Sequence, residues 1–475
     1  RNWVLSSNKK MAKTIVVFIP LLGGVGHLLP TLEFAERLLD HRHDIAIHVL
    51  GLRLPSDKVS ISSVMAAHPR LHFAMLPVVD SPLCGTPEAS LEKYLCDFIA
   101  MYSDSLRNSL LDIQALATSQ GGRVGGLVLD YFCSSLIDVA NELSLPSYLF
   151  FTSCAGFLRF MQWLPSWDDH GGSSFVFSDS KYRIPGFRNT VPINAMPSPC
   201  FNSQGGYATL LSLARRFNDA KGIVINTFSE LESYALGGID VGRAPLVYDV
   251  GPVINFKGYA GADMEEHKKR EAMEWLEEQP DSSVVFVCFG SVGAFPSSQV
   301  REIAEGIERS GFRFLWSLRV PLKESGKAAE EMLPLGFMER VKGRGLICGW
   351  VKQVDVLGHR AIGGFLSHCG WNSVLESVWH GVPQATLPIF ADQRLTAFEM
   401  VKEVGIAVEL KIEDAAETCF ATAEEVERAL VALMDEHCQE RKTVREMSVA
   451  ARKTVKDGGS SFSSLAQFVS HICEF

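Results

Sequence analysis

The sequence predicts an α/β protein built from two doubly wound parallel sheets that face a central cleft. The first observation is length, because 475 residues exceed the roughly 250–300 residues at which a single hydrophobic core stops growing. The second is that short runs of Val, Ile, Leu and Phe alternate with helical patterns along the whole chain. Such runs are typical of parallel strands buried on both faces, so we expect two Rossmann-like domains.

The first predicted domain spans residues 11–255. Its expected strands are Thr14–Pro20, Ile45–Leu52, Leu71–Val79, Gly125–Asp130, Ser147–Phe151, Gly222–Phe228 and Leu246–Val250. Helical patterns such as Leu32–Leu39 separate them, which is the alternation that a parallel sheet requires. A polar, glycine-containing stretch over 256–272 then predicts an interdomain linker.

The second predicted domain spans residues 273–457. Its expected strands are Val284–Phe289, Phe312–Leu318, Gly345–Gly349, Gly364–Ser367, Gln384–Leu387 and Ile406–Leu410. Helices are expected over Ser297–Ser310 and after Thr422, where Glu425 completes a capping-box pattern. Residues 458–475 are expected to cross back and pack on the first domain.

Bulk composition excludes several classes of function. The net charge of −10 leaves no overall electrostatic footprint for nucleic acid. No apolar stretch reaches the roughly 18 residues that a transmembrane helix needs. The eleven cysteines form no CxxC pair and no cluster with zinc spacing. We therefore expect free thiols, no bound metal and a reducing compartment, the cytoplasm.

The apolar run at residues 14–22 follows Lys9, Lys10 and Lys13 and imitates a signal peptide. A glycine turn and a helical pattern come directly after it, and no cleavage site is well placed. We interpret the run as a core strand. Met11 is the expected natural start, which would make Arg1–Lys10 an added leader.

A phosphate cradle is predicted where the strand Gly364–Ser367 ends. The glycine turn after it leads into a helix expected from Asn372, since Asn372 and Ser373 are good N-cap residues. Free N–H groups and the helix dipole make such a helix start an anion site. His368 can donate to a phosphate oxygen, and Glu376, one turn into the helix, suits a ribose diol.

Ser291 ends another strand of the same domain, next to Gly290, which permits close backbone approach. Each of these residues alone has an ordinary structural interpretation: a core histidine, a packing tryptophan at Trp371, or turn glycines. Their joint occurrence favours a nucleotide site.

A general base is predicted in the first domain. His27 follows a glycine turn at the end of the first strand and precedes a helix expected to begin near Pro30. Its ordinary pKa near 6.5 suits proton abstraction. Asp130 ends a neighbouring strand and could orient the imidazole. Alternatively, His27 is a surface residue at a helix N-terminus and Asp130 a cap. Gly24 and Gly26 also hint at a dinucleotide fingerprint, but Leu29 stands at its third glycine position.

Residues 350–393 closely resemble the signature box of plant family 1 UDP-sugar glycosyltransferases, which have the GT-B fold. The matching positions are Trp350, Gln353, His359, Gly364-Phe365, His368–Ser373, Glu376, Gly381–Pro383, Pro388 and Asp392-Gln393. Other similar segments are Leu129–Cys133, Phe151–Ser153, Lys221–Phe228 and Asp457–Ser461. The resemblance spans Met11–Phe475 and is strongest to the flavonoid, phenylpropanoid and triterpenoid branch.

The resemblance implies a role for each matching residue. By this resemblance, uracil and ribose are bound by Trp350, Val351, Gln353 and Glu376. The diphosphate is bound by Ser291, His368, Asn372 and Ser373. Sugar contacts fall to Thr152, Trp371, Asp392 and Gln393, and the Asp392-Gln393 pairing is associated with glucose. His27 and Asp130 form the catalytic pair. Candidates for the acceptor pocket are Gly24, Phe132, Met196, Phe201 and Phe390.

The chain departs from the family pattern at two places. The box usually opens Trp-Ala-Pro-Gln, whereas Val351 and Lys352 occupy its middle positions here. Losing the proline frees φ, but we expect the loop to keep its shape because Trp350 and Gln353 remain. Thr396 stands where the family often has Asn.

The resemblance implies an inverting, metal-independent transfer of glucose from UDP-glucose to a hydroxyl of a small lipophilic plant metabolite. C-glucosylation by the same base is an alternative. A non-catalytic UDP-sugar-binding protein is another, disfavoured by the presence of both His27 and Asp130. A nicotinamide-dependent oxidoreductase is disfavoured by the missing acidic ribose residue. We expect a monomer with UDP-sugar and aglycone as its ligands.

Overall fold

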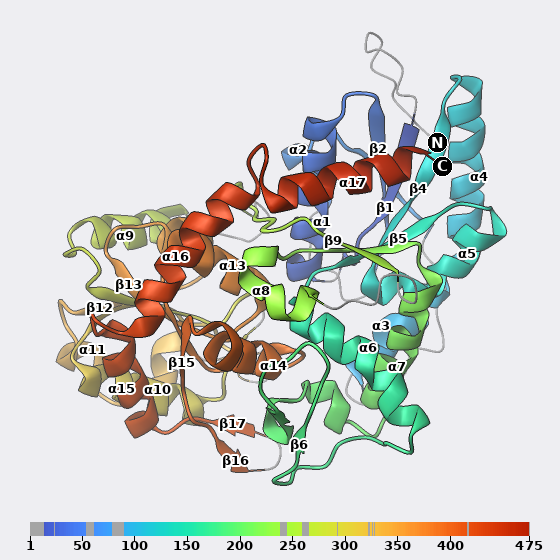
Figure 1. The fold of residues 1–475 in the computed structure, drawn as a ribbon. Coiled ribbons are helices and arrows are strands. Elements are labelled where there is room, and N and C mark those ends of the chain that lie inside the picture. The colour runs from blue at the N-terminus through green and yellow to red at the C-terminus, as the bar shows by residue number, and fades with distance from the viewer. Residues whose placement is uncertain are drawn as a thin grey trace.

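Two parallel sheets form the centre of the molecule, each covered by helices (Figure 1). The computed structural model describes residues 14–22, 24–53, 61–77, 90–237, 245–258, 266–291, 293–321, 324, 326, 328–415 and 418–474. In Figure 1 the first domain runs from blue to green and the second from yellow to orange.

The first sheet has seven strands in the order β3-β2-β1-β4-β5-β8-β9. They are β1 Thr14–Ile19, β2 Ile45–Gly51, β3 His72–Met75, β4 Arg123–Asp130, β5 Ser147–Phe151, β8 Gly222–Ile225 and β9 Leu246–Asp249. All the pairings are parallel, and Ile19 of β1 lies opposite Leu129 of β4. The strand order reverses between β1 and β4, and such switch points are where ligands bind in open α/β sheets.

The second sheet has six strands in the order β12-β11-β10-β13-β14-β15. They are β10 Val284–Cys288, β11 Arg313–Ser317, β12 Gly345–Cys348, β13 Ile362–Ser367, β14 Gln384–Thr386 and β15 Ala407–Glu409. Its order reverses between β10 and β13, where Cys288 and Ser367 are in register. The residues that follow these two strands therefore emerge side by side. The strand predictions of both domains agree with the structure to within a few residues, because the buried runs carry almost no polar side chain.

Helices cover both sheets. Those of the first domain are α1 Val25–His41, α2 Ile61–Ala67, α3 Leu91–Ala100, α4 Ser103–Ser119, α5 Ile137–Glu142, α6 Ala155–Asp169, α7 Gly206–Arg216 and α8 Ser229–Leu236. Those that follow are α9 Glu266–Glu277, α10 Ser297–Ser310, α11 Phe337–Arg340, α12 Gln353–Leu357, α13 Trp371–His380, α14 Gln393–Phe398, α15 Ala423–Met434, α16 Gln439–Thr454 and α17 Ser460–Glu474.

The structure differs from the prediction in the linker and in the capping box. Helix α9 starts inside the predicted linker 256–272, and its Ala272 and Leu276 are buried in the core of the second domain. The Thr422 hydroxyl caps the N–H of Glu425 at 3.3 Å, but only this half of the capping box forms. The carboxylate of Glu425 instead accepts from Lys411 N and pairs with Arg428.

The C-terminal helix α17 packs back on the first domain, where it lies across the blue strands in Figure 1. Its Phe468 is fully buried with Phe34 and Tyr148 in one apolar cluster. The Tyr248 hydroxyl also lies 2.5 Å from Nδ1 of His471. None of the described helices is both long and apolar enough to cross a membrane.

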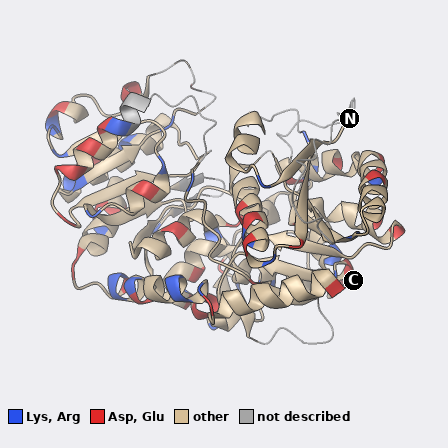
Figure 2. Cartoon of the chain, turned by 90° about the horizontal axis from the view of Figure 1, so that it is seen from above, with Lys and Arg blue, Asp and Glu red and all other residues tan. Residues whose placement is uncertain are grey.

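Acidic and basic residues alternate along the outer helices of both domains (Figure 2). In this view the basic residues among those described form no continuous stripe.

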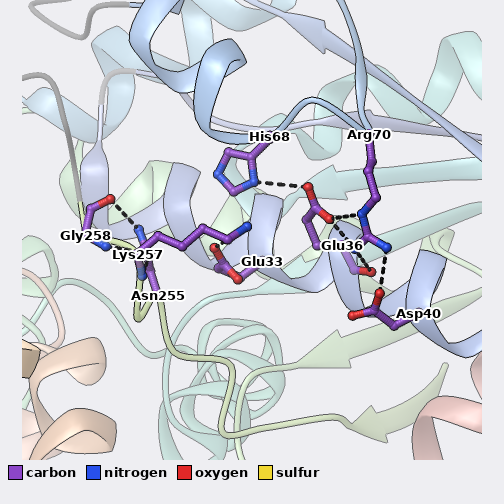
Figure 3. A network of polar contacts seen from close by, with 8 residues as sticks. All are labelled: Glu33, Glu36, Asp40, His68, Arg70, Asn255, Lys257 and Gly258. Atoms are coloured by element: carbon purple, nitrogen blue, oxygen red, sulfur yellow. Dashed lines mark hydrogen bonds and ion pairs between the residues drawn. The ribbon is translucent and has the colours of Figure 1, made fainter.

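Helix α1 is tied to the segment that leaves the first domain (Figure 3). Lys257 Nζ lies 3.8 Å from the carboxylate of Glu33, and Arg37 donates to Pro252 O at 2.6 Å. On the next turn Glu36 accepts from Arg70 at 2.6 Å and lies 3.4 Å from His68 Nδ1. These contacts fix the helix that carries His27 at its N-terminal end.

Candidate active site

His27 and Asp130 meet at the switch point of the first sheet. Nδ1 of His27 lies 2.8 Å from Oδ2 of Asp130, whose side chain is 0% exposed. Asp130 caps the 3₁₀ helix η1 (Tyr131–Leu136), because its Oδ1 accepts from Phe132 N at 3.0 Å. With Nδ1–H donated to Asp130, the Nε2 lone pair is the free base.

Helix α1 begins at Val25, earlier than the expected start near Pro30, so His27 lies in its first turn. Pro30 has no N–H and cannot bond the carbonyl of Gly26 four residues before it. That carbonyl accepts instead from Nδ2 of Asn372 in the second domain, at 2.8 Å. Pro30, which the sequence suggested as a helix start, thus leaves the carbonyl of Gly26 free to accept a hydrogen bond from the second domain.

The electrostatic surroundings favour the charged imidazole of His27. Burial lowers the pKa of His27, but the charge and hydrogen bond of Asp130, together with the charge of Asp392, outweigh it and raise the pKa above its ordinary value. An acidic side chain on each domain therefore stabilises the imidazolium that forms when His27 takes a proton.

The turn after β5 connects the base to the second domain. The Thr152 hydroxyl lies 3.0 Å from His27 Nδ1, and the Ser153 hydroxyl donates to Oδ2 of Asp392. Thr152, expected to contact the sugar, is thus also a partner of the imidazole. Ser153 lies in a family-like segment of the sequence, but nothing in its residue type pointed to Asp392.

The phosphate cradle lies at the switch point of the second sheet. Helix α13 begins at Trp371 with Gly370 as N-cap. Asn372 and Ser373 therefore lie in its first turn and are not the N-caps that the sequence predicted. The reason is Cys369, whose φ of +62° closes the turn one residue earlier. Free N–H groups of this turn remain available to an anion.

The imidazole of His368 sits between two glycines, one on each switch-point strand end. A Cβ on Gly290 or on Gly370 would lie 2.5 Å from its Nε2. Burial lowers the pKa of His368 to about 4, and its Nδ1 has no partner among the described residues. His368 is therefore a neutral donor in the empty site. Ser291 is exposed beside it, and its carbonyl accepts from Arg319.

Gln353, Ser373 and Glu376 form a connected polar group on α12 and α13. Nε2 of Gln353 donates to Ser373 Oγ and to Glu376 Oε2, both at 2.8 Å. Trp350 is half-buried just before α12, and Val351 is buried. Lys352 has φ −73°, close to the value that a proline imposes. The loop therefore keeps the shape expected despite the missing proline.

Glu376 is expected to make the binding of UDP-glucose pH-dependent. Burial raises the pKa of Glu376 to about 7, although Gln353 opposes the shift. Ribose hydroxyls donate to the carboxylate, so binding should strengthen as the pH rises from 6 to 8. Calorimetric titration at several pH values would show this trend, and Glu376→Gln should remove it. Equal pH dependence in the variant would show that another group titrates.

The sugar-end candidates lie on the turn before α14 and at the start of α13. Oε1 of Gln393 accepts from the backbone N–H groups of Ile389 and Phe390 at 2.9 and 3.1 Å, which leaves its NH₂ group to reach a ligand. The Trp371 indole is buried and donates to Asn226 O at 2.6 Å. Its side chain therefore joins the domains, and sequence reasoning gave no role to Asn226.

Some of the acceptor-pocket candidates lie near His27 or are exposed, whereas others pack elsewhere. Phe132 packs edge-on against His27 with ring centroids 5.6 Å apart, and it lines a cavity of about 410 Å³ with Cys96 and Leu213. Gly24 also borders His27, and Phe390 is 39% exposed.

Two of these candidates are engaged elsewhere. Met196 is 0% exposed and packs in the core of the first domain, so its assignment to the pocket wall stays a prediction. Phe201 stacks on Phe177 at 4.1 Å, and Arg394 lies over that ring.

Asp168 and Asp169 end helix α6, and His170 is its C-cap. Both aspartates pair with Arg215, at 3.0 and 2.6 Å. His170 Nδ1 lies 2.6 Å from Ser166 O. These three side chains therefore belong to the end of a helix and not to a loop.

Taken together, a His–Asp pair on one doubly wound domain and, on the other, a helix N-terminus suited to an anion with a glutamate suited to a ribose diol point to a nucleotide-sugar transferase. A family model described as "UDP-glucoronosyl and UDP-glucosyl transferase" matches residues 243–455. The chain belongs to this UDP-glycosyltransferase family, and its fold is GT-B.

Three relatives illustrate the match. UDP-glycosyltransferase 71K1 of Malus domestica is 42% identical, over 97% of this chain and 99% of its own. Flavonol 3-O-glucosyltransferase UGT71C4 of Arabidopsis thaliana is 42% identical, over 97% and 98%. The crystal structure of Medicago truncatula UGT71G1 complexed with UDP-glucose has a TM-score of 0.86 at 41% identity, over 97% of this chain and 98% of that one.

Proposed function

We propose that this UDP-glycosyltransferase transfers glucose from UDP-glucose to a hydroxyl group of a small lipophilic plant metabolite, such as a flavonoid, phenolic or terpenoid, with inversion at the anomeric carbon. The observation that carries the proposal is the 2.8 Å contact between His27 and Asp130, which lies opposite the phosphate cradle. A protein that only bound UDP-sugars would not need an oriented base. The flavonol glucosyltransferase among the relatives supports an aromatic acceptor.

The reaction begins with the acceptor hydroxyl beside Nε2 of His27. This nitrogen takes the hydroxyl proton while the oxygen attacks the anomeric carbon from the face opposite the diphosphate. Asp130 keeps the Nδ1 proton in place and stabilises the imidazolium through their hydrogen bond. Because the donor is the α-linked UDP-glucose and the attack inverts its anomeric carbon, the new carbon–oxygen bond is that of a β-glucoside.

The leaving group is UDP, which departs with the electron pair of the broken bond between the anomeric carbon and the phosphate oxygen. The negative charge that develops there lies at the N-terminus of α13, where free N–H groups point outward. His368 is neutral, because burial lowers its pKa to about 4, and it can donate through its single ring N–H. We propose that these donors replace a divalent cation, so the reaction needs none.

Asp392 and Gln393 are proposed to bind the sugar hydroxyls, with Thr152 and Trp371 at its edges. Asp392 accepts from Ser153 and its charge acts on His27, which supports a sugar contact close to the base. The nine cysteines that the structure describes are all free, which supports the proposal of a reducing, cytoplasmic setting.

One experiment tests the whole proposal. The protein is incubated with EDTA and a panel of flavonols, phenolic acids and triterpenes, each with UDP-glucose, UDP-galactose or UDP-glucuronate, and products are identified by mass spectrometry. We expect glucosides from UDP-glucose at undiminished rate in EDTA. A requirement for added Mg²⁺ would contradict the metal-free mechanism, and UDP-sugar binding without any product would favour a binding protein.

The same products distinguish O- from C-glucosylation. An O-glucoside releases glucose on acid hydrolysis, whereas a C-glucoside does not. We expect complete release, and acid-stable products would support the alternative in which His27 activates a phenol ring carbon.

A further inference from the structure

A cluster of buried ionisable side chains joins the two domains at the end of α14 remote from Asp392. Glu399 begins the π-helix η7 (Glu399–Val404) of the second domain, whereas Glu232 and Cys154 belong to the first. Both glutamates are 0% exposed. One carboxyl oxygen of each and the Cys154 sulfur lie within 4.8 Å of one another.

Burial raises the pKa of Glu232, but donors of its own domain oppose this shift and favour its carboxylate form. Its Oε1 accepts from the backbone N–H groups of Ala155 and Gly156 at 2.8 and 3.2 Å. Its Oε2 accepts from the Thr227 hydroxyl. Two backbone N–H groups at the start of α6 and a hydroxyl together stabilise the ionised form of a buried carboxyl.

Glu399 has weaker donors and faces Glu232 directly. Its Oε2 accepts from the Tyr234 hydroxyl at 3.0 Å and its Oε1 lies 3.5 Å from the Cys154 sulfur. Among the described residues no cation pairs with either glutamate. The guanidinium of Arg188 lies 5.3 Å from the centre of the Tyr234 ring, which separates it from Glu399.

The two carboxyls hydrogen-bond to each other. Such a bond needs a proton, and two adjacent carboxylates would repel strongly in a buried site. Burial and the charge of Glu232 raise the pKa of Glu399 well above its ordinary value. The proton therefore resides on Glu399. Cys154 and Tyr234, whose pKa values burial also raises well above the ordinary range, stay neutral.

We propose that Glu232 and Glu399 share one proton across the domain interface, and that Glu399 thereby acts as a positioning residue for the sugar-binding turn at Asp392. The kinetic part of this inference rests on the proposed glucosyl transfer. Asp392 precedes α14 and Glu399 follows it. A hydrogen bond from Glu399 at one end of this helix therefore fixes the position of Asp392 at the other end.

The partners of α14 on the first domain are consecutive residues after β5. Ser153 donates to Asp392, and the Cys154 sulfur lies 3.6 Å from the Thr396 hydroxyl and 3.5 Å from Glu399. Thr152, the residue before them, contacts His27. One tripeptide thus sets the helix of the sugar site against the base. Gly156 makes room for the acid, since a Cβ there would lie 2.0 Å from Glu399 Oε1.

Two substitutions of Glu399 distinguish the effect of its proton from the effect of its packing. Glu399→Gln retains a neutral donor toward Glu232, so we expect kcat/KM within about twofold of the wild type. Glu399→Leu removes the donor and leaves Glu232 facing an apolar group. We expect a rise of about tenfold in the KM for UDP-glucose and a loss of up to about 10²-fold in kcat, because a displacement of roughly 1 Å at a reacting centre can cost that much.

The affinity for UDP, which lacks the sugar, should change little in Glu399→Leu, because uridine and diphosphate are held by α12 and α13. Equal losses for UDP and UDP-glucose would indicate general damage and overturn the positioning role. So would unchanged kinetics in Glu399→Leu.

Infrared difference spectroscopy tests the shared proton without any activity measurement. At pH 8 the wild type should show the carbonyl stretch of a protonated carboxylic acid that Glu399→Gln lacks. Glu403→Gln is the matched control, since Glu403 lies on the same π-helix and also bonds across the domains, to Arg188 N and Asn189 N at 3.1 and 2.9 Å. It should lose no such band. An identical spectrum in Glu399→Gln would overturn the shared proton, even if no acceptor were found.

Discussion

Replacing His27 with alanine is expected to lower the rate of O-glucosyl transfer by about 10²–10⁴-fold, the usual contribution of a general base. The affinity for UDP-glucose should stay nearly unchanged, because the nucleotide cradle belongs to the second domain. Product formation by mass spectrometry and binding by calorimetry would measure the two effects separately. Retained turnover would show that another group takes the acceptor proton.

Asp130→Asn is the informative companion of His27→Ala. The charge of Asp130 raises the pKa of His27, so its loss should lower that pKa. Transfer needs the neutral imidazole, and its rate therefore falls at pH values below the pKa of His27. The acidic limb of the pH–rate profile should move to lower pH, while the maximal rate falls because the tautomer is no longer held. An acidic limb that stayed at the same pH would show that Asp130 does not raise the pKa of His27.

Gly290→Ala is expected to weaken UDP-glucose binding by roughly 10–100-fold. The new Cβ would lie 2.5 Å from Nε2 of His368 and would displace the imidazole from the phosphate cradle. A hydrogen bond to a charged group is worth about 1.5–3 kcal/mol, which corresponds to this range. Calorimetric titration with UDP-glucose measures the loss.

The left-handed backbone at Gly290 also resists alanine, so a control must separate strain from displacement. Gly343 has the same φ of +77°, and nothing lies within 4 Å of a Cβ built there. Both alanine variants should lose about 1–2 kcal/mol of stability from the left-handed conformation alone, seen as similar falls in Tm. Only Gly290→Ala should lose affinity. Weaker binding in both variants would attribute the effect to strain.

The two sheets were predictable because parallel strands buried on both faces leave a local record. Most strands of the two main sheets correspond to an apolar run such as Ser147–Phe151. The placement of His27 and His368 near strand ends was predictable for the same reason. The assignment of the family depended on motif residues over 350–393.

Helix starts were less predictable, because a cap depends on one backbone angle. Asn372 and Ser373 have N-cap side chains, yet Gly370 caps α13 since Cys369 turns the chain at φ +62°. Pro30 suggested a helix start near itself, but α1 begins at Val25 with Gly24 as its N-cap. Met196 has the apolar character of a pocket wall, and only packing shows that it is fully buried.

The sequence by itself determined the class of fold, the family and the set of residues at the switch points, because these depend on patterns within a few consecutive residues. Only the tertiary structure decided which distant side chains meet: Asn372 with Gly26, Trp371 with Asn226, Ser153 with Asp392, and Glu232 with Glu399. The physical reason is that such contacts depend on how two domains are placed against each other, which no local pattern encodes. The neutral state of His368 and the proton on Glu399 likewise follow from burial.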